Sequence, residues 1–182
     1  MKKSFTILSI LLISLYSCNY KEKKAEKEAE IDIIKSTLIE VGQTVPEFSY
    51  ITLNNDTINV NDLKGKVVFM NFFATSCPIC IKELPFVESD IWAKYKDNDN
   101  FELIVFGREH VAEEMIAFKE KNGYTFNIVP DPGRKIYSLF AERYIPRNFV
   151  LDRDGNIIYQ ATGFIDEEFA KLKETIENEL NK

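Results

Sequence analysis

The chain has 182 residues, and its 29 acidic residues outnumber its 23 lysines and arginines, which gives a formal net charge of -6 at pH 7. Proteins that bind nucleic acids need a basic surface for the phosphate backbone, so this acidic balance excludes a nucleic-acid partner on charge grounds. No internal repeat, Pro/Gly-rich linker or second hydrophobic block divides the chain, which excludes a second large domain.

The first residues are typical of an export signal. Lys2 and Lys3 form a positive start, and residues 5–16 form an apolar stretch with only Thr and Ser interruptions. This stretch is shorter than the ~20 residues that span a bilayer, so a signal peptide at residues 1–17 is the better interpretation. Its removal takes away two lysines and no acids, which changes the net charge from -6 to -8.

The signal segment ends in Leu15-Tyr16-Ser17-Cys18, which resembles the lipobox of bacterial lipoproteins. In that class the signal peptide is cut before the cysteine, and the cysteine thiol carries diacylglycerol. Lipidation also explains an odd cysteine, because Cys77 and Cys80 form an obvious pair. We therefore expect lipid on Cys18 to anchor the protein in the bacterial cell envelope, facing the periplasm or the cell exterior. The alternative is an ordinary signal peptide with an incidental cysteine.

Residues 18–42 are expected to be a lipidated, charged tether. Residues 21–30 are almost entirely charged, which is typical of a solvated linker. Residues 31–41 have apolar residues at mixed spacing and are a candidate short helix. Residues 43–182 are long enough for one domain with its own core.

Strands and helices alternate in this domain. The continuous apolar run at residues 67–73 predicts a central strand that is covered on both faces. Pro85 is expected to kink the helix that follows. The closing hairpin makes the sheet mixed, so we predict an α/β fold with a central mixed sheet flanked by helices and an N-terminal β extension. The predicted strands are residues 48–53, 57–60, 67–73, 101–106, 125–129, 147–152 and 156–162, and the predicted helices are residues 78–95, 111–121, 134–140 and 166–180.

The most informative motif is Cys77-Pro78-Ile79-Cys80, at the junction between the apolar strand and the next helix. Two cysteines with this spacing can close a small, reversible disulfide. The helix N-terminus stabilises a thiolate on Cys77, so we expect Cys77 to attack and Cys80, one turn deeper, to resolve the mixed disulfide. The alternatives are a structural disulfide and half of a zinc site. A zinc site needs further ligands, and the only histidine, His110, lies outside the motif.

Three further segments accompany this motif: residues 65–75 before it, Glu83-Leu84-Pro85 after it, and Ile145-Pro146 followed by residues 149–155. Together with Gly163, this ordered set resembles TlpA/ResA-like thioredoxin-fold proteins over residues 43–180. The resemblance implies a thioredoxin-like fold. The chain departs from the family at Ser76 and Phe73, where tryptophan is usual, and has Asn71 where thioredoxin has a buried aspartate.

The resemblance also implies roles for residues outside the motif. Glu83 would be a buried carboxylate that exchanges protons with Cys80, whereas its position alone favours a solvent-exposed glutamate in the first turns of the helix. Pro146 would follow a cis peptide bond and place the Ile145 backbone beside the cysteines, where it could bind an extended substrate chain. A trans proline in an ordinary loop is the alternative.

The expected function is a membrane-anchored thiol–disulfide oxidoreductase that acts as a reductase on exported cysteine-containing proteins. Apo-cytochrome c is one candidate substrate by resemblance. No cofactor is expected beyond the Cys77–Cys80 disulfide, and no metal. A reductase must be recharged, so an upstream thiol protein is expected as electron donor.

Two other functions remain open. A thiol peroxidase of the peroxiredoxin type would need a threonine and an arginine around one cysteine, and Thr75 is poorly spaced for that pattern. A Sco-like copper chaperone would use two cysteines separated by three residues together with a histidine. His110 follows a predicted strand and is a candidate base, although a lone histidine is more often a surface or helix-start residue.

Overall fold

The structure is a computed structural model that describes residues 23–25 and 27–182. The expected signal peptide and Cys18 lie outside these residues. The chain divides into two units, Met1–Ser36 and Thr37–Lys182. None of the helices in the described residues is both long and apolar enough to cross a membrane.

The described part of the first unit is mainly helical, at residues 23–25 and 27–35. Lys24 Nζ lies 3.9 Å from Glu28 Oε1 one turn on, with both side chains exposed. Such i, i+4 pairs stabilise a helix modestly. The charged segment interpreted as a solvated tether is therefore helical where it is described, and the short helix expected at residues 31–41 ends at residue 35.

The second unit begins at Thr37, before the boundary at residue 43 expected from the sequence. The Leu38 N–H donates to the Phe140 carbonyl at 2.9 Å, and the Gly42 N–H donates to the Ile157 carbonyl at 2.8 Å. Ile39 is buried in the core. These contacts attach residues 37–42 to the domain.

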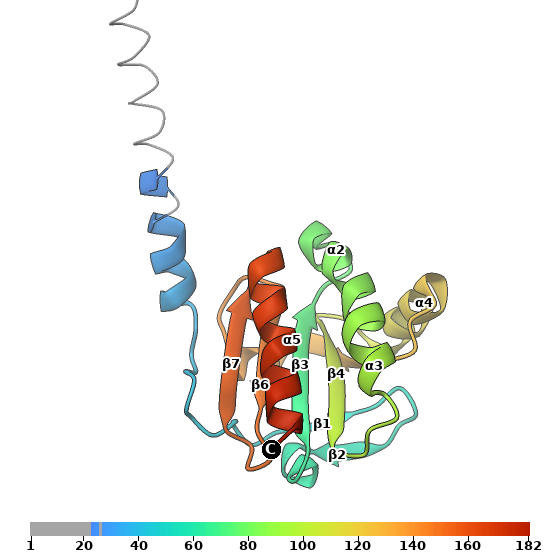
Figure 1. The fold of residues 1–182 in the computed structure, drawn as a ribbon. Coiled ribbons are helices and arrows are strands. Elements are labelled where there is room, and N and C mark those ends of the chain that lie inside the picture. The colour runs from blue at the N-terminus through green and yellow to red at the C-terminus, as the bar shows by residue number, and fades with distance from the viewer. Residues whose placement is uncertain (1–22, 26) are drawn as a thin grey trace, which may run out of the picture. The chain divides into compact units, whose positions relative to one another are not determined.

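A five-stranded mixed sheet with the order β5-β4-β3-β6-β7 forms the centre of this unit (Figure 1). β3 (Val67–Phe73) pairs in parallel with β4 (Phe101–Arg108), and β4 in parallel with β5 (Asn127–Asp131). β6 (Arg147–Leu151) and β7 (Ile157–Thr162) form the antiparallel side. All of β3 is buried, which confirms the central strand, and the predicted mixed sheet is confirmed as well.

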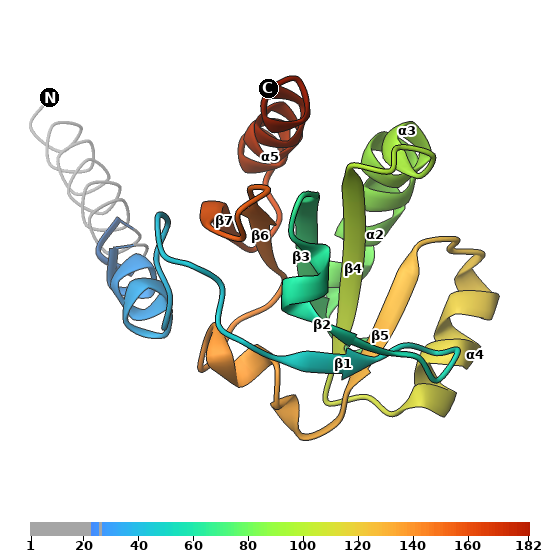
Figure 2. The same ribbon diagram turned by 90° about the horizontal axis from the view of Figure 1, so that it is seen from below.

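Different elements cover the two faces of the sheet (Figure 2). Successive strand residues point to opposite faces, so the odd-numbered residues of β3 face α2 (Pro78–Phe86) and α5 (Asp166–Leu180). The even-numbered residues pack against the antiparallel pair β1 (Ser49–Ile51) and β2 (Thr57–Asn59), which is the N-terminal β extension, and against the short turn η1 (Val60–Leu63). α4 (Ala112–Asn122) packs beside β5 and inserts Met115 into the α2 face.

The helix expected at residues 78–95 is composite. α2 contains Pro85 and is followed directly by the π-helical η2 (Val87–Trp92) and then by α3 (Ala93–Tyr95). Proline has no N–H to donate to the preceding turn, so the regular bonding pattern is interrupted there and the following turn widens. The expected irregularity at Pro85 therefore takes the form of a change of helix type.

The helix predicted at residues 134–140 is wrong. Two 3-10 turns, η3 (Pro132–Arg134) and η4 (Tyr137–Leu139), occupy this segment. Gly133 has a φ of 73°, which breaks helical geometry. The Asp131 carboxylate accepts the N–H groups of Ile136 and Tyr137 at 2.9 Å each, so these donors are satisfied without an α-helix.

Candidate active site

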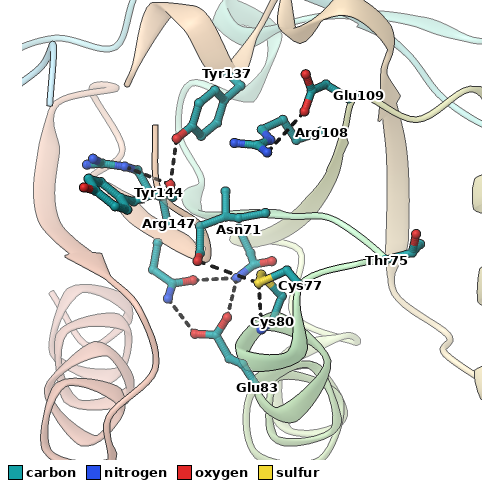
Figure 3. The surroundings of a disulfide bond; sticks show 12 residues. Asn71, Thr75, Cys77, Cys80, Glu83, Arg108, Glu109, Tyr137, Tyr144 and Arg147 are labelled. Carbon is teal, nitrogen blue, oxygen red and sulfur yellow. Dashed lines mark hydrogen bonds and ion pairs between the residues drawn. A yellow bond between two sulfur atoms is a disulfide. The ribbon is translucent and has the colours of Figure 1, made fainter. Parts of the chain in front are cut away.

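Cys77 and Cys80 form a disulfide at the N-terminus of α2, with their Cα atoms 5.3 Å apart (Figure 3). Cys77 is the N-cap residue, and its sulfur accepts the Cys80 N–H at 3.2 Å. Pro78 occupies the first turn, where its missing N–H costs nothing. Cys77 is partly exposed and Cys80 is fully buried. Only the Cys77 sulfur is therefore open to a partner, and it lies where a helix favours negative charge.

The loop before β6 places backbone groups beside this sulfur. The Ile145–Pro146 peptide bond is cis, as the sequence predicted. The Ile145 carbonyl oxygen lies 3.7 Å from Cys77 Sγ. The Ile145 N–H makes no hydrogen bond to the part of the chain that the structure describes. An extended polypeptide at Cys77 would thus find both main-chain groups of Ile145 within its reach.

Glu83 is buried beneath the disulfide, with 1% of the residue exposed. Its Oε2 accepts from Asn71 Nδ2 at 2.9 Å and its Oε1 accepts from Asn148 Nδ2 at 2.6 Å (Figure 3). Burial raises the pKa of Glu83 from 4.5 to about 7, although both amide donors favour the charged form. The carboxyl therefore titrates near neutral pH, one helical turn beyond Cys80. The burial implied by the resemblance is confirmed.

The two asparagines come from neighbouring strands. Asn71 on β3 lies opposite Asn148 on β6, and Asn71 Nδ2 also donates to Asn148 Oδ1 at 2.7 Å. Both side chains point to the face covered by α2, because they alternate with residues that face β1 and β2. Sequence reasoning noted Asn71 but missed Asn148. The available signal was an amide just before the apolar run Phe149–Leu151 in the strand after Pro146.

A shallow surface crevice, too narrow to hold a water molecule, is lined by Glu83 and Asn148. Tyr159 and Glu168 also line it, and the Tyr159 hydroxyl donates to the Glu168 carbonyl at 2.7 Å.

His110 lies next to the loop that precedes Cys77, not at the cysteines themselves. Its Nε2 accepts the Thr75 N–H at 3.1 Å, and its Nδ1 lies 3.0 Å from Glu114 Oε2. No bond between His110 and either cysteine is present in the described residues. The neighbouring Arg108 pairs with Glu109 at 3.1 Å and lies over the Tyr137 ring. Within the described ranges, no group of three or more His, Cys, Asp or Glu side chains is arranged to hold a metal ion.

Known proteins share this arrangement of sequence and fold. The Redoxin family model matches residues 40–176. The thiol-disulfide oxidoreductase ResA of Bacillus thuringiensis (strain Al Hakam) is 31% identical over 144 residues, which make up 79% of this chain and 79% of that protein. ResA of Bacillus subtilis (strain 168) is 29% identical over 164 residues, with 88% and 84% covered. A solved structure from Bacteroides thetaiotaomicron, provisionally described as a protein disulfide isomerase, is 35% identical with a TM-score of 0.77 and covers 81% of this chain and 94% of its own.

Proposed function

This chain belongs to the Redoxin family and is a thiol–disulfide oxidoreductase, and from that premise we propose that it reduces disulfides in exported proteins. The observation that carries the proposal is the asymmetry of the cysteine pair. Cys77 is accessible at a helix N-terminus, whereas Cys80 is buried one turn from a carboxyl that titrates near neutral pH. The dithiol must release two protons when it reduces a disulfide, and this arrangement favours loss of one proton from Cys77 and transfer of the other from Cys80 to the carboxyl.

The proposed reaction starts from the reduced dithiol. The Cys77 thiolate attacks one sulfur of a substrate disulfide, so that a mixed disulfide forms and the other substrate sulfur leaves as a thiolate. Cys80 then loses its proton and attacks Cys77 Sγ, which breaks the mixed disulfide and releases the second substrate thiolate. Two electrons pass from the cysteine pair to the substrate, and the enzyme is left with the Cys77–Cys80 disulfide.

Glu83 is proposed as the acceptor of the Cys80 proton. Its carboxyl shares a helix face with Cys80, and it is half charged near pH 7. An ordinary exposed glutamate would hold its proton too weakly to return it at this pH.

Ile145 and Pro146 are proposed to bind the substrate chain. The free Ile145 N–H and the nearby carbonyl offer one donor and one acceptor to an extended segment that carries the substrate cysteine. These contacts involve only the main chain of the substrate, so a range of exported proteins could bind in this way. Apo-cytochrome c is one candidate. An upstream thiol protein would use the same surface to return electrons to the disulfide, and no cofactor is required.

The direction of the reaction is tested by the reduction potential of the Cys77–Cys80 pair. We expect the full-length protein, equilibrated in dithiothreitol or glutathione buffers, to show one reversible two-electron couple near the thioredoxin value of about -270 mV. A value near about -120 mV would contradict reduction and make the protein a disulfide donor. Absence of a reversible couple would overturn the enzymatic proposal itself.

Membrane attachment is proposed to depend on lipid at Cys18. Each buried methylene contributes ~0.8 kcal/mol to membrane binding, so a diacylglycerol with further acylation anchors a protein stably. In a bacterial host that processes lipoproteins, Cys18→Ser is expected to move most of the protein from the membrane fraction to the soluble fraction, whereas Ser14→Ala is expected to leave it attached. Attachment of the Cys18→Ser variant at the level of the unaltered protein would refute lipidation.

A further inference from the structure

The loop between β3 and α2 is hydrogen-bonded to His110, a residue outside the loop that the proposed reaction does not use. Within the loop, the Cys77 N–H donates to the Ala74 carbonyl at 3.1 Å. The Thr75 N–H points away from this turn and donates to His110 Nε2 at 3.1 Å, and Thr75 Oγ1 lies 3.3 Å from the same nitrogen. Thr75 is two residues before the nucleophile, so this bond constrains where Cys77 lies.

The partners of the imidazole define its protonation state. A backbone N–H can only donate, so Nε2 must present its lone pair to Thr75. A neutral imidazole then carries its proton on Nδ1, which donates to Glu114 Oε2 at 3.0 Å. The same carboxylate oxygen accepts the Val111 N–H at 3.0 Å, and these contacts lower the pKa of Glu114, so it is charged at neutral pH.

Backbone and packing contacts with β4 and α4 hold His110 in place. Its own N–H donates to the Gly107 carbonyl at 3.2 Å. A Cβ atom at Gly107 would overlap Met115 Sδ, so the Met115 side chain of α4 fills the space above the end of β4 that only glycine leaves open. His110 and Glu114 are thereby fixed to the sheet, and the imidazole is mostly shielded, with 14% of its side chain exposed.

We propose that His110, held as the Nδ1–H tautomer by Glu114, is a positioning residue that fixes Thr75 and so delivers Cys77 to the N-terminus of α2. The proposal rests on the proposed function, because it concerns the orientation of the same nucleophile. Protonation of the imidazole places a hydrogen on Nε2, which removes the acceptor and releases the Thr75 N–H. The charged group that contacts the imidazole is Glu114 on α4, and the two charged residues that precede His110, Arg108 and Glu109, pair with each other.

The test measures the alkylation rate of Cys77 by iodoacetamide in the reduced full-length protein, across a range of pH. Cys80 is buried, and every protein compared carries Cys18→Ser, so the rate reports on Cys77 alone. His110→Ala is expected to slow alkylation at pH 7 about tenfold, the loss that follows from one hydrogen bond and a displaced nucleophile. His110→Gln keeps an acceptor near the Nε2 position and is expected to stay within about threefold of the unaltered protein.

The charge on α4 provides a matched pair of variants. Glu114→Gln leaves Nδ1 an uncharged partner and is expected to lower the alkylation rate, whereas Glu113→Gln removes the same charge from an exposed neighbour and is expected to change nothing. NMR of the unaltered protein gives a readout independent of reactivity: the imidazole nitrogens are expected to show the Nδ1–H tautomer at pH 7.5, and the Thr75 amide resonance is expected to shift as His110 titrates.

The proposal is overturned by an Nε2–H tautomer at pH 7.5, by a Thr75 amide that ignores the titration of His110, or by a His110→Ala rate equal to that of the unaltered protein. Failure of a folded His110→Gln variant to restore the rate would also overturn it. If His110→Ala does not fold, the NMR results and the glutamine variant decide the matter. Failure of the proposed function would instead be seen as the lack of a reversible disulfide couple in the unaltered protein, with the Thr75–His110 contact intact.

Discussion

Replacing Cys77 with serine is expected to abolish disulfide reduction, with a rate at least about a thousandfold below that of the unaltered protein. The hydroxyl of serine is nearly the size of a thiol, but it is not ionised near neutral pH and cannot form the mixed disulfide. Cys77 is the only sulfur of the pair that a partner can reach, since Cys80 is fully buried. Cys80 therefore cannot take over the first step. Release of thiols from a disulfide-bonded peptide gives the rate.

Cys80→Ser is the matched control for this experiment. It keeps the attacking thiolate but removes the thiol that resolves the intermediate, so the protein is expected to accumulate covalently linked to its substrate through Cys77. Mass spectrometry of the intact adduct identifies both the linkage and the captured protein. A linked intermediate in Cys77→Ser, with none in Cys80→Ser, would reverse the roles assigned to the two cysteines.

Much of the fold could be predicted because its strands carry strong local patterns. The run of β3, apolar except for Asn71, favoured a strand covered on both faces, and the structure buries every residue in it. The segment at residues 134–140 could not be predicted in the same way. Its composition suits a helix, but the Asp131 carboxylate takes the N–H groups of Ile136 and Tyr137, and Gly133 adopts a left-handed conformation. A side-chain contact from five and six residues earlier in the chain thus replaces helical hydrogen bonding.

In the candidate site, the local arrangement could be predicted from the sequence and the contacts between distant segments could not. Cys77, Cys80 and Glu83 lie within two helical turns, so a short motif places them relative to one another. The Asn148 contact with Glu83 depends on the register between β3 and β6, which joins residues far apart in the chain. His110 was noticed as a lone histidine, but its bond to Thr75 depends on how the ends of β3 and β4 meet. Pattern alone carries no information about such pairings.

Removing the charge of Glu83 is expected to flatten the dependence of stability on pH. The folded protein raises the pKa of this carboxyl from 4.5 to about 7. Between these values the folded state binds more protons than the unfolded chain, so the free energy of unfolding falls as pH rises through this window. The loss is complete above about pH 7 and is on the order of 3 kcal/mol. Glu83→Gln is neutral throughout, so it lacks this slope.

The amide nitrogen that the substitution introduces meets a donor, because Asn71 Nδ2 and Asn148 Nδ2 both point at the carboxyl. One hydrogen bond is therefore lost at every pH, so the test compares the change in stability between two pH values and not the stability itself. Urea unfolding of the oxidised protein at pH 4.5 and pH 8 measures the effect. Glu120→Gln, an exposed substitution on α4 with the same change of charge, is the control and is expected to keep the slope of the unaltered protein.

The same substitution separates a catalytic role of Glu83 from a purely structural one. A positioned proton acceptor contributes about a hundredfold or more to a rate, so Glu83→Gln is expected to slow resolution of the mixed disulfide by about that factor near pH 7. The inflection near pH 7 in the rate of this step is expected to disappear, because the variant has no carboxyl to titrate. Stopped-flow mixing of reduced protein with a model disulfide resolves the step from the initial attack. A flattened stability profile with an unchanged kinetic profile would leave Glu83 a buried charge without a role in proton transfer, since stability responds to burial alone and only the kinetic inflection requires exchange with Cys80.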